Sequence, residues 1–115
     1  MLTEESLMQF TGTEAYHNYF NLKLTDGVCY LAKEGKCFWL LDIILSYQPK
    51  YHQIPFQLWE LEVKEDKEKR SATVYMREDS DKKPLVKQFI PYTDFPLASI
   101  KIYVIDGVVL LPSEY

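Results

Sequence analysis

The chain reads Ile100-Lys101-Ile102-Tyr103-Val104-Ile105-Asp106-Gly107-Val108-Val109-Leu110-Leu111 near its C-terminal end. Two runs of β-branched and other apolar residues flank the pair Asp106-Gly107. Glycine accepts the positive φ angle that a two-residue type I′ turn requires, so this pair predicts a tight hairpin between two antiparallel strands. The last part of the sequence is therefore expected to form sheet.

Alternating apolar and polar residues upstream predict further strands. Trp59, Leu61 and Val63 alternate with charged residues, which is typical of a half-buried strand. Residues 71–77 alternate in the same way, and the polar run between the two strands predicts a hairpin connection. A third strand is predicted at residues 85–92, and its two apolar faces suggest a central position in the sheet. We expect four or five antiparallel strands in a meander.

The N-terminal part of the sequence favours helices. A first helix is predicted from the cap at Thr3 to about residue 10, and Gly12 can then adopt the left-handed conformation that often ends a helix. A second, short helix is predicted at residues 25–35. A third, mostly buried helix begins at residue 38 and ends at Pro49.

One domain is expected for residues 1–115, with a helical half over residues 1–50 and a sheet half over residues 55–112. With 115 residues, of which 47% are hydrophobic, the chain can bury one core and is too small for two. The segment 14–24 shows neither a helical nor a strand period, and we interpret it as extended or irregular. The predicted fold class is α+β, with N-terminal helices packed on a C-terminal antiparallel meander sheet.

Charge and hydropathy argue against several classes of protein. The formal net charge is −4, with both signs mixed along the chain, which disfavours direct nucleic-acid binding. The longest apolar stretch, residues 38–45, is much shorter than the roughly 20 residues of a membrane-spanning helix. Glu4 and Glu5 stand where a secretory signal would be basic, so we expect a cytoplasmic protein without membrane contact.

The sequence contains no pattern for a metal or a cofactor. Cys29 and Cys37 lie among apolar residues and are interpreted as reduced, buried thiols. Neither they nor His17 and His52 have the spacing of metal ligands. Glycine-rich phosphate-binding patterns are missing as well, so we expect no cofactor.

Acidic residues suggest one hypothesis, a small enzyme or small-molecule binder with a pocket formed by Asp42 and Asp94, joined by His17 or His52. Two carboxylates that meet in a cleft can act as acid and base. For Asp94, which follows a threonine at a predicted turn, bonding to local backbone amides is the ordinary alternative. Asp42 either faces solvent or is buried with a partner, and burial would make it a candidate site.

Aromatic residues suggest a second hypothesis, a non-enzymatic protein-interaction or regulatory module. Nine Tyr and six Phe exceed what one small core must hold, and tyrosines at a surface commonly mark recognition. The alternative is that these rings cover the outer face of the sheet and pair across strands. The candidate surface, for a protein partner or a second copy of the chain, consists of Tyr47, Tyr51, Phe56, Tyr75 and Tyr103.

Residues 111–115 directly follow the last predicted strand. Such a tail either frays or tucks back so that Tyr115 packs on the sheet or on a neighbouring subunit. The sequence leaves both outcomes open.

Five segments distributed over nearly the whole chain carry a resemblance to a known family. They are Gln9-Phe10-Thr11-Gly12-Thr13-Glu14, Thr25-Asp26-Gly27-Val28 with Tyr30-Leu31-Ala32, Trp39-Leu40-Leu41-Asp42, Tyr92-Thr93-Asp94-Phe95-Pro96-Leu97, and Leu111-Pro112-Ser113-Glu114-Tyr115. With these segments the chain resembles a family of small uncharacterised bacterial and mobile-element proteins, a domain of unknown function. The resemblance implies no activity, ligand or site residues.

Overall fold

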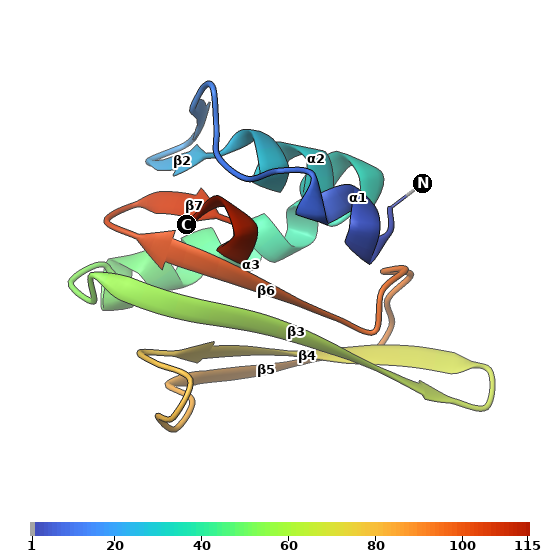
Figure 1. The fold of residues 1–115 in the computed structure, drawn as a ribbon. Coiled ribbons are helices and arrows are strands. Elements are labelled where there is room, and N and C mark those ends of the chain that lie inside the picture. Colours follow the sequence, from blue (N-terminus) through green and yellow to red (C-terminus); the bar gives the residue numbers. More distant parts are fainter. Residues whose placement is uncertain (1) are drawn as a thin grey trace.

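A mixed sheet of seven strands forms the centre of the structure, a computed structural model that describes residues 2–115 (Figure 1). The order across the sheet is β1-β2-β7-β6-β3-β4-β5. Neighbouring strands are antiparallel except β2 and β7, which run parallel. The strands are β1 (His17–Tyr19), β2 (Leu22–Leu24), β3 (Phe56–Asp66), β4 (Lys69–Arg77), β5 (Val86–Ile90), β6 (Ser99–Ile105) and β7 (Val108–Leu110). The helices are α1 (Glu4–Met8), α2 (Asp26–Glu34), α3 (Phe38–Tyr51) and a short 3₁₀ helix, η1 (Pro112–Glu114).

The pair Asp106-Gly107 forms the predicted two-residue turn between β6 and β7. Ile105 and Val108 are directly opposed across it, and φ is +50° at Asp106 and +82° at Gly107. Positive φ at both central residues is characteristic of a type I′ turn, whose twist matches that of the flanking strands. The hairpin predicted from residues 100–111 is confirmed.

Gly107→Ala is expected to lower the free energy of unfolding by about 1–2 kcal/mol, because a residue with a Cβ is strained at this positive φ. A Cβ at Gly107 would meet no atom of the described residues within 4 Å, so the loss would come from the backbone alone. Gly12→Ala is the matched control, since its Cβ is equally unobstructed and its φ is not positive. Urea denaturation should show a loss only for Gly107→Ala, and equal stability of the two variants would contradict the assigned turn.

The C-terminal half contains five strands, within the predicted four or five, but only β3-β4-β5 form a meander, because β6 returns to pair with β3. The expectation that these strands make up the whole sheet is wrong. The hairpin β1-β2 adds two strands from the N-terminal half, and it joins the sheet because β2 pairs with β7. Residues 1–50 are therefore not purely helical. Strands of three residues are too short to display a period of two, which explains why the segment 14–24 showed no pattern.

Strands β3 and β4 continue into the charged segment 64–70, although its polarity predicts a connection between the strands. Asp66 and Lys69 are directly opposed, so only Lys67 and Glu68 form the turn. These strand ends project beyond the core with exposed side chains, and their backbone ladder needs no apolar cover.

Strand β5 lies at the edge of the sheet, so the predicted central position of residues 85–92 is wrong. In the described chain, β4 is its one neighbour. Val86 faces the core and is buried, whereas Phe89 on the other face is 64% exposed. Of the two apolar faces of β5, one is therefore buried against the core and the other is exposed to solvent.

The first two helices begin at the predicted caps. The Thr3 hydroxyl accepts from the Ser6 amide at 3.0 Å, and the Thr25 hydroxyl accepts from the Val28 amide at 3.4 Å. However, α1 ends at Met8, and Gly12 does not adopt the predicted left-handed conformation.

Helix α3 continues through Pro49 to Tyr51, so the predicted end at Pro49 is wrong. Proline removes one backbone donor and strains the preceding turn. The last turn of α3 is nevertheless stabilised by two hydrogen bonds. The His52 amide donates to the Gln48 carbonyl at 2.7 Å, and the Gln57 side-chain amide donates to the Tyr51 carbonyl at 3.0 Å. Tertiary contacts with β3 therefore override the local signal.

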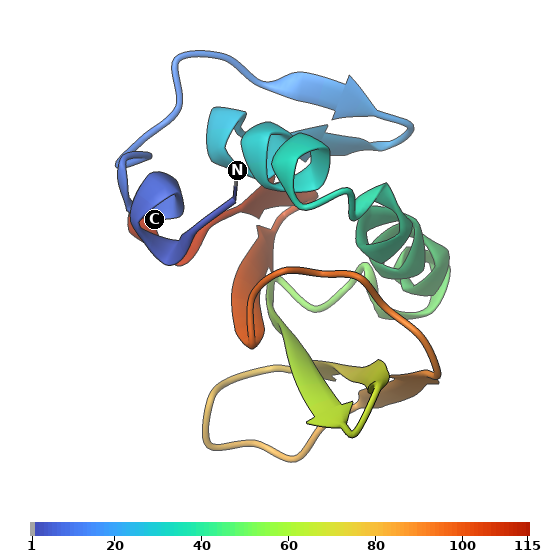
Figure 2. The same ribbon diagram turned by 90° about the vertical axis from the view of Figure 1, so that its right-hand side faces the viewer.

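Helices α2 and α3 pack on one face of the sheet, which we call the inner face. Figure 2 shows α3 on this side and the C-terminal turn on the opposite, outer side. Opposed residues of neighbouring strands share a face, and Trp59, Ile102 and Met76 form a row on the inner face, each at most 1% exposed.

Among residues 2–115, no helix is long and apolar enough to cross a membrane.

Candidate functional site

The outer face of β3, β6 and β7 carries a group of apolar and aromatic residues. The register places Phe56 opposite Ile105, and Tyr103 opposite both Leu58 and Leu110. Leu58 is buried although it lies on the face away from α3, and the other members are half-buried. The group consists of Phe56, Leu58, Tyr103, Ile105, Val108 and Leu110.

Three aromatic rings contact one another at this position, and we call them the aromatic cluster: Phe56, Tyr103 and Tyr115. The ring centroids of Phe56 and Tyr103 are 4.9 Å apart. The ring of Tyr115 meets both of them edge-on, at 6.3 Å from Phe56 and 5.7 Å from Tyr103. Tyr115 is 76% exposed, so the cluster presents an aromatic surface to solvent.

The Glu114 carboxylate positions Tyr115 by binding the N-terminus of α2. Its Oε1 accepts from the Thr25 hydroxyl at 2.6 Å and from the Leu111 amide at 3.0 Å, and its Oε2 accepts from the Gly27 amide at 3.1 Å. A carboxylate is favourable there because the helix dipole is positive at this end. A Cβ on Gly27 would lie 2.6 Å from Glu114 Oε1, so a larger residue at this position would displace the carboxylate. The C-terminal segment is therefore tucked back and does not fray.

Basic residues outnumber acidic ones in the strand rows around the aromatic cluster, although the whole chain has a net charge of −4. Lys87 and Arg77 lie over the ring of Tyr75, with charge-to-centroid distances of 5.9 Å and 5.5 Å. Arg77 also donates to Glu60 at 3.1 Å. The three rows of opposed outer-face residues nearest the cluster contain one acidic residue, Glu60, and the basic residues Lys23, Arg77, Lys87 and Lys101.

The sheet separates the five aromatic residues predicted as one surface. Phe56, Tyr75 and Tyr103 share the outer face. Tyr47 and Tyr51 lie on α3 on the inner side, where both are half-buried. The Tyr47 ring lies 6.0 Å from that of Trp59 and its hydroxyl donates to Gln88, while the Tyr51 hydroxyl donates to the Leu85 carbonyl.

Asp42 and His52, two residues of the predicted acidic pocket, lie at different positions along α3 and contact different neighbours. Asp42 is exposed and accepts a hydrogen bond from the Tyr19 hydroxyl. This bond is the main reason why the pKa of Tyr19 is raised to about 12. His52 Nδ1 lies 3.2 Å from the Gln48 carbonyl oxygen at the end of the helix.

His17 pairs with Asp26, outside any cluster with Asp42 or Asp94. Its Nε2 lies 2.8 Å from Asp26 Oδ1, and the Glu14 amide donates to Asp26 Oδ2 at 3.0 Å. The bond from His17 is the largest cause of the lowered pKa of Asp26, followed by the bond from the Glu14 amide. The Asp26 carboxylate thus links the first residue of β1 and the loop before it to the start of α2.

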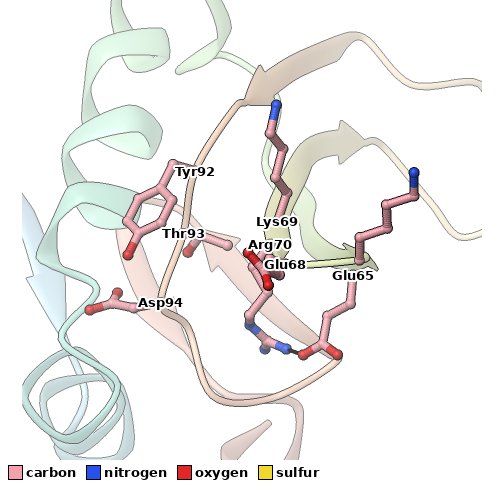
Figure 3. Close-up of a pocket in the computed structure, with 8 residues that line it drawn as sticks. Glu65, Glu68, Lys69, Arg70, Tyr92, Thr93 and Asp94 are labelled. Atoms are coloured by element: carbon pink, nitrogen blue, oxygen red, sulfur yellow. Dashed lines mark hydrogen bonds and ion pairs between the residues drawn. The ribbon is translucent and has the colours of Figure 1, made fainter.

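Asp94 lies on the segment between β5 and β6 and lines a hollow of about 380 Å³ against the β3-β4 hairpin (Figure 3). Arg70 in this hollow is already engaged, because it donates to the Glu65 carboxylate and to the Phe95 carbonyl. Figure 3 shows the Asp94 carboxylate pointing away from this pair. The hollow therefore does not bring Asp94 to Asp42, His17 or His52, and its other acids are Glu65, which is paired with Arg70, and Glu68. Its lining residues are Glu65, Lys67, Glu68, Lys69, Arg70, Tyr92, Thr93 and Asp94.

The two free cysteines lie in or beside the core: Cys37 is buried and Cys29 is half-buried. Burial raises the pKa of Cys37 to about 12, and burial is also the main cause of the raised pKa of Cys29. Such thiols are poor nucleophiles because the thiolate is the reactive form. Within residues 2–115, no group of three or more His, Cys, Asp or Glu residues could hold a metal ion.

The segments that carry the family resemblance meet in two places. Residues 9–14, 25–28 and 111–115 meet at the N-terminus of α2 through the bonds of Asp26 and Glu114. Trp39 from the third segment and residues 92–94 from the fourth line a common hollow beside β5. The sequence patterns do not single out Glu114 or Tyr115 as site residues. The one available signal was the Leu-Pro-Ser-Glu sequence, in which proline and a following glutamate are typical of a helix start.

Comparison with known proteins agrees with the resemblance found in the sequence. No curated protein and no solved structure matches the chain significantly. A model of a family of unknown function, DUF6876, matches residues 1–115, and the chain therefore belongs to this family.

Proposed function

We propose that the protein is a non-enzymatic interaction module that binds another protein through its outer sheet face. The observation that supports the proposal best is the aromatic cluster of Phe56, Tyr103 and Tyr115, which stands on a face that α2 and α3 leave uncovered. Rigid aromatic side chains in the centre of a contact supply much of the binding energy in protein interfaces.

The charges around the cluster indicate the chemistry of the partner. Lys23 is exposed in the same row of opposed residues as Phe56, and Lys101 is exposed in the row on the other side of Tyr103. The one acidic residue of these rows and of the row between them, Glu60, is paired with Arg77. A complementary surface would insert an apolar side chain between the rings and surround it with carboxylates. The partner we propose is therefore an acidic protein surface with an apolar centre.

The alternative, an enzyme with an acidic pocket, is not supported by any cluster of its residues. Asp42, His17 and His52 each contact a different neighbour, and of the four predicted residues only Asp94 lines the hollow of Figure 3. Acid and base catalysis requires groups within reach of one substrate.

Tyr115→Ala is expected to weaken partner binding about 30-fold, the loss that corresponds to a strong aromatic contact of about 2 kcal/mol. Tagged wild-type protein and variants would be used to recover partners from the native cell, with mass spectrometry as the readout. Tyr16→Ala is the matched control, because Tyr16 is 59% exposed and lies in the loop before β1. Its partners should equal those of the wild type.

A second variant, Lys101→Glu, tests the predicted charge of the partner. The same protein should be lost with Tyr115→Ala and with Lys101→Glu, and its retention should fall as salt rises. Equal recovery from wild type, Tyr115→Ala and Tyr16→Ala would refute the proposal. Recovery that is abolished by nuclease would refute it as well, because it would identify a nucleic acid as the ligand.

A further inference from the structure

The edge strand β5 offers an unpaired backbone to a second strand. Its five residues, Val86 to Ile90, bond to β4 on one side, and alternate residues direct their N–H and C=O groups to the other side. Edge strands are commonly protected by charges, by proline, by a bulge or by a covering segment, and the prolines here, Pro84 and Pro91, lie outside the five residues of β5. β5 contains a single charged residue, Lys87, and its neighbour Phe89 is 64% exposed.

A stripe of apolar residues on α3 runs along the same edge. Trp39, Ile43 and Tyr47 follow one another at intervals of four residues, so they lie on one side of the helix. All three are half-buried. Trp39 and Ile43 line a hollow of about 380 Å³ together with Ile90 of β5, and Tyr47 bonds Gln88. This edge of the molecule therefore combines unpaired backbone groups on β5 with a half-buried apolar stripe on the neighbouring helix α3.

We propose that a second copy of the chain occupies this edge, with the two β5 strands paired antiparallel about a two-fold axis at Gln88. This inference goes beyond the proposed function, because it concerns the edge of the sheet and not the aromatic cluster. Two seven-stranded sheets would join into one continuous sheet. A two-fold axis perpendicular to the sheet places both outer faces on the same side, so the dimer would present two aromatic clusters together.

The sequence of β5 is self-complementary in this register. Val86 stands opposite Ile90 of the partner subunit, so apolar residues meet under the two α3 stripes. Lys87 stands opposite Phe89 of the partner subunit on the outer face, where an ammonium group and an aromatic ring attract each other. Gln88 meets Gln88 of the partner subunit, and amide side chains can bond across a strand pair.

Neighbouring registers are less favourable. An axis at Lys87 would place two ammonium groups directly opposite each other, which destabilises a strand pair. An axis at Phe89 would move Lys87 opposite Pro91, which has no backbone donor. Because Pro84 and Pro91 flank the strand, the register centred on Gln88 is the one that uses all five residues.

Analytical ultracentrifugation of the wild-type chain over a range of concentrations tests the proposal. The expected mass is twice the 13.6 kDa of the chain. Phe89→Lys should weaken dimerisation roughly tenfold or more, because it loses the ring and brings two like-charged pairs together by symmetry. Phe20→Lys is the control at the opposite end of the sheet, where Phe20 is 79% exposed in the β1-β2 turn, and its dimer should equal that of the wild type.

A charge exchange makes the test specific for the register. Adding Lys87→Glu to Phe89→Lys places opposite charges across the axis, and the double variant should recover the dimer. Circular dichroism would verify that each variant is folded. A monomeric wild type, a dimer unaffected by Phe89→Lys, or a folded double variant that stays monomeric would each overturn the proposal. Loss of partner binding by Tyr115→Ala in an intact dimer would separate this inference from the proposed function.

Discussion

Trp59→Ala is expected to lower the free energy of unfolding by about 3–5 kcal/mol, the largest effect of any single substitution proposed for this chain. Trp59 is 1% exposed and stands in the central row of the inner face, between Ile102 and Met76. Removing the indole leaves a cavity under α3. It also removes the donor that bonds Gln57 Oε1 at 2.9 Å. Since a domain of this size is stable by only about 5–15 kcal/mol, the variant should lose a large fraction of its total stability.

The second tryptophan is the matched control for this prediction. Trp39 lies on α3 and is half-buried, so Trp39→Ala should cost about 1–2 kcal/mol at most. Urea unfolding followed by far-ultraviolet circular dichroism would measure both variants. Equal losses of unfolding free energy for the two variants would mean that Trp59 is not buried in the core between the sheet and α3.

Glu114→Ala is expected to lower the free energy of unfolding by about 2–3 kcal/mol, because it leaves three donors without their acceptor. These donors are the Thr25 hydroxyl and the amides of Gly27 and Leu111. Thr25 is only 2% exposed, so water replaces the lost bond poorly. The loss is large for the penultimate residue of the sequence, because substitutions near a terminus are usually tolerated.

Glu78→Ala is the control for Glu114→Ala. Glu78 is exposed directly after β4, and removing it should change stability by less than about 0.5 kcal/mol. Thermal and urea unfolding of the two variants would compare them. A Glu114→Ala protein as stable as Glu78→Ala would show that the C-terminal segment is not anchored on α2.

Local signals in the sequence were sufficient for much of the fold. The Asp106-Gly107 turn, the caps at Thr3 and Thr25, and the alternation at Trp59, Leu61 and Val63 all depend on neighbouring residues, and all are found in the structure. These features are predictable because backbone conformation and side-chain period are set within a few residues.

Features that depend on contacts between distant segments were not predictable. β5 lies at the edge because β6 returns to pair with β3 and not with β5, and two apolar faces look alike in a central strand and in an exposed edge. Helix α3 passes Pro49 because residues of β3 hold its last turn. A local rule could give neither result.

The candidate site was only partly accessible from the sequence. An excess of tyrosines indicated a surface, but the division of Tyr47 and Tyr51 from Phe56 and Tyr103 follows from the sheet register and the position of α3. Tyr115 joins the cluster through Glu114, which bonds Thr25 and thereby spans 89 residues of sequence. No periodicity can report a bond over this separation.

The most direct test of the central claim, that Glu114 holds Tyr115 in the aromatic cluster, is a nuclear Overhauser experiment on the side-chain rings. The wild-type protein should show cross-peaks from the Tyr115 ring to the rings of Phe56 and Tyr103, and Glu114→Ala should lose them while the Phe56–Tyr103 cross-peaks persist. Random-coil shifts and no inter-ring cross-peaks for Tyr115 in the wild-type protein would contradict the claim.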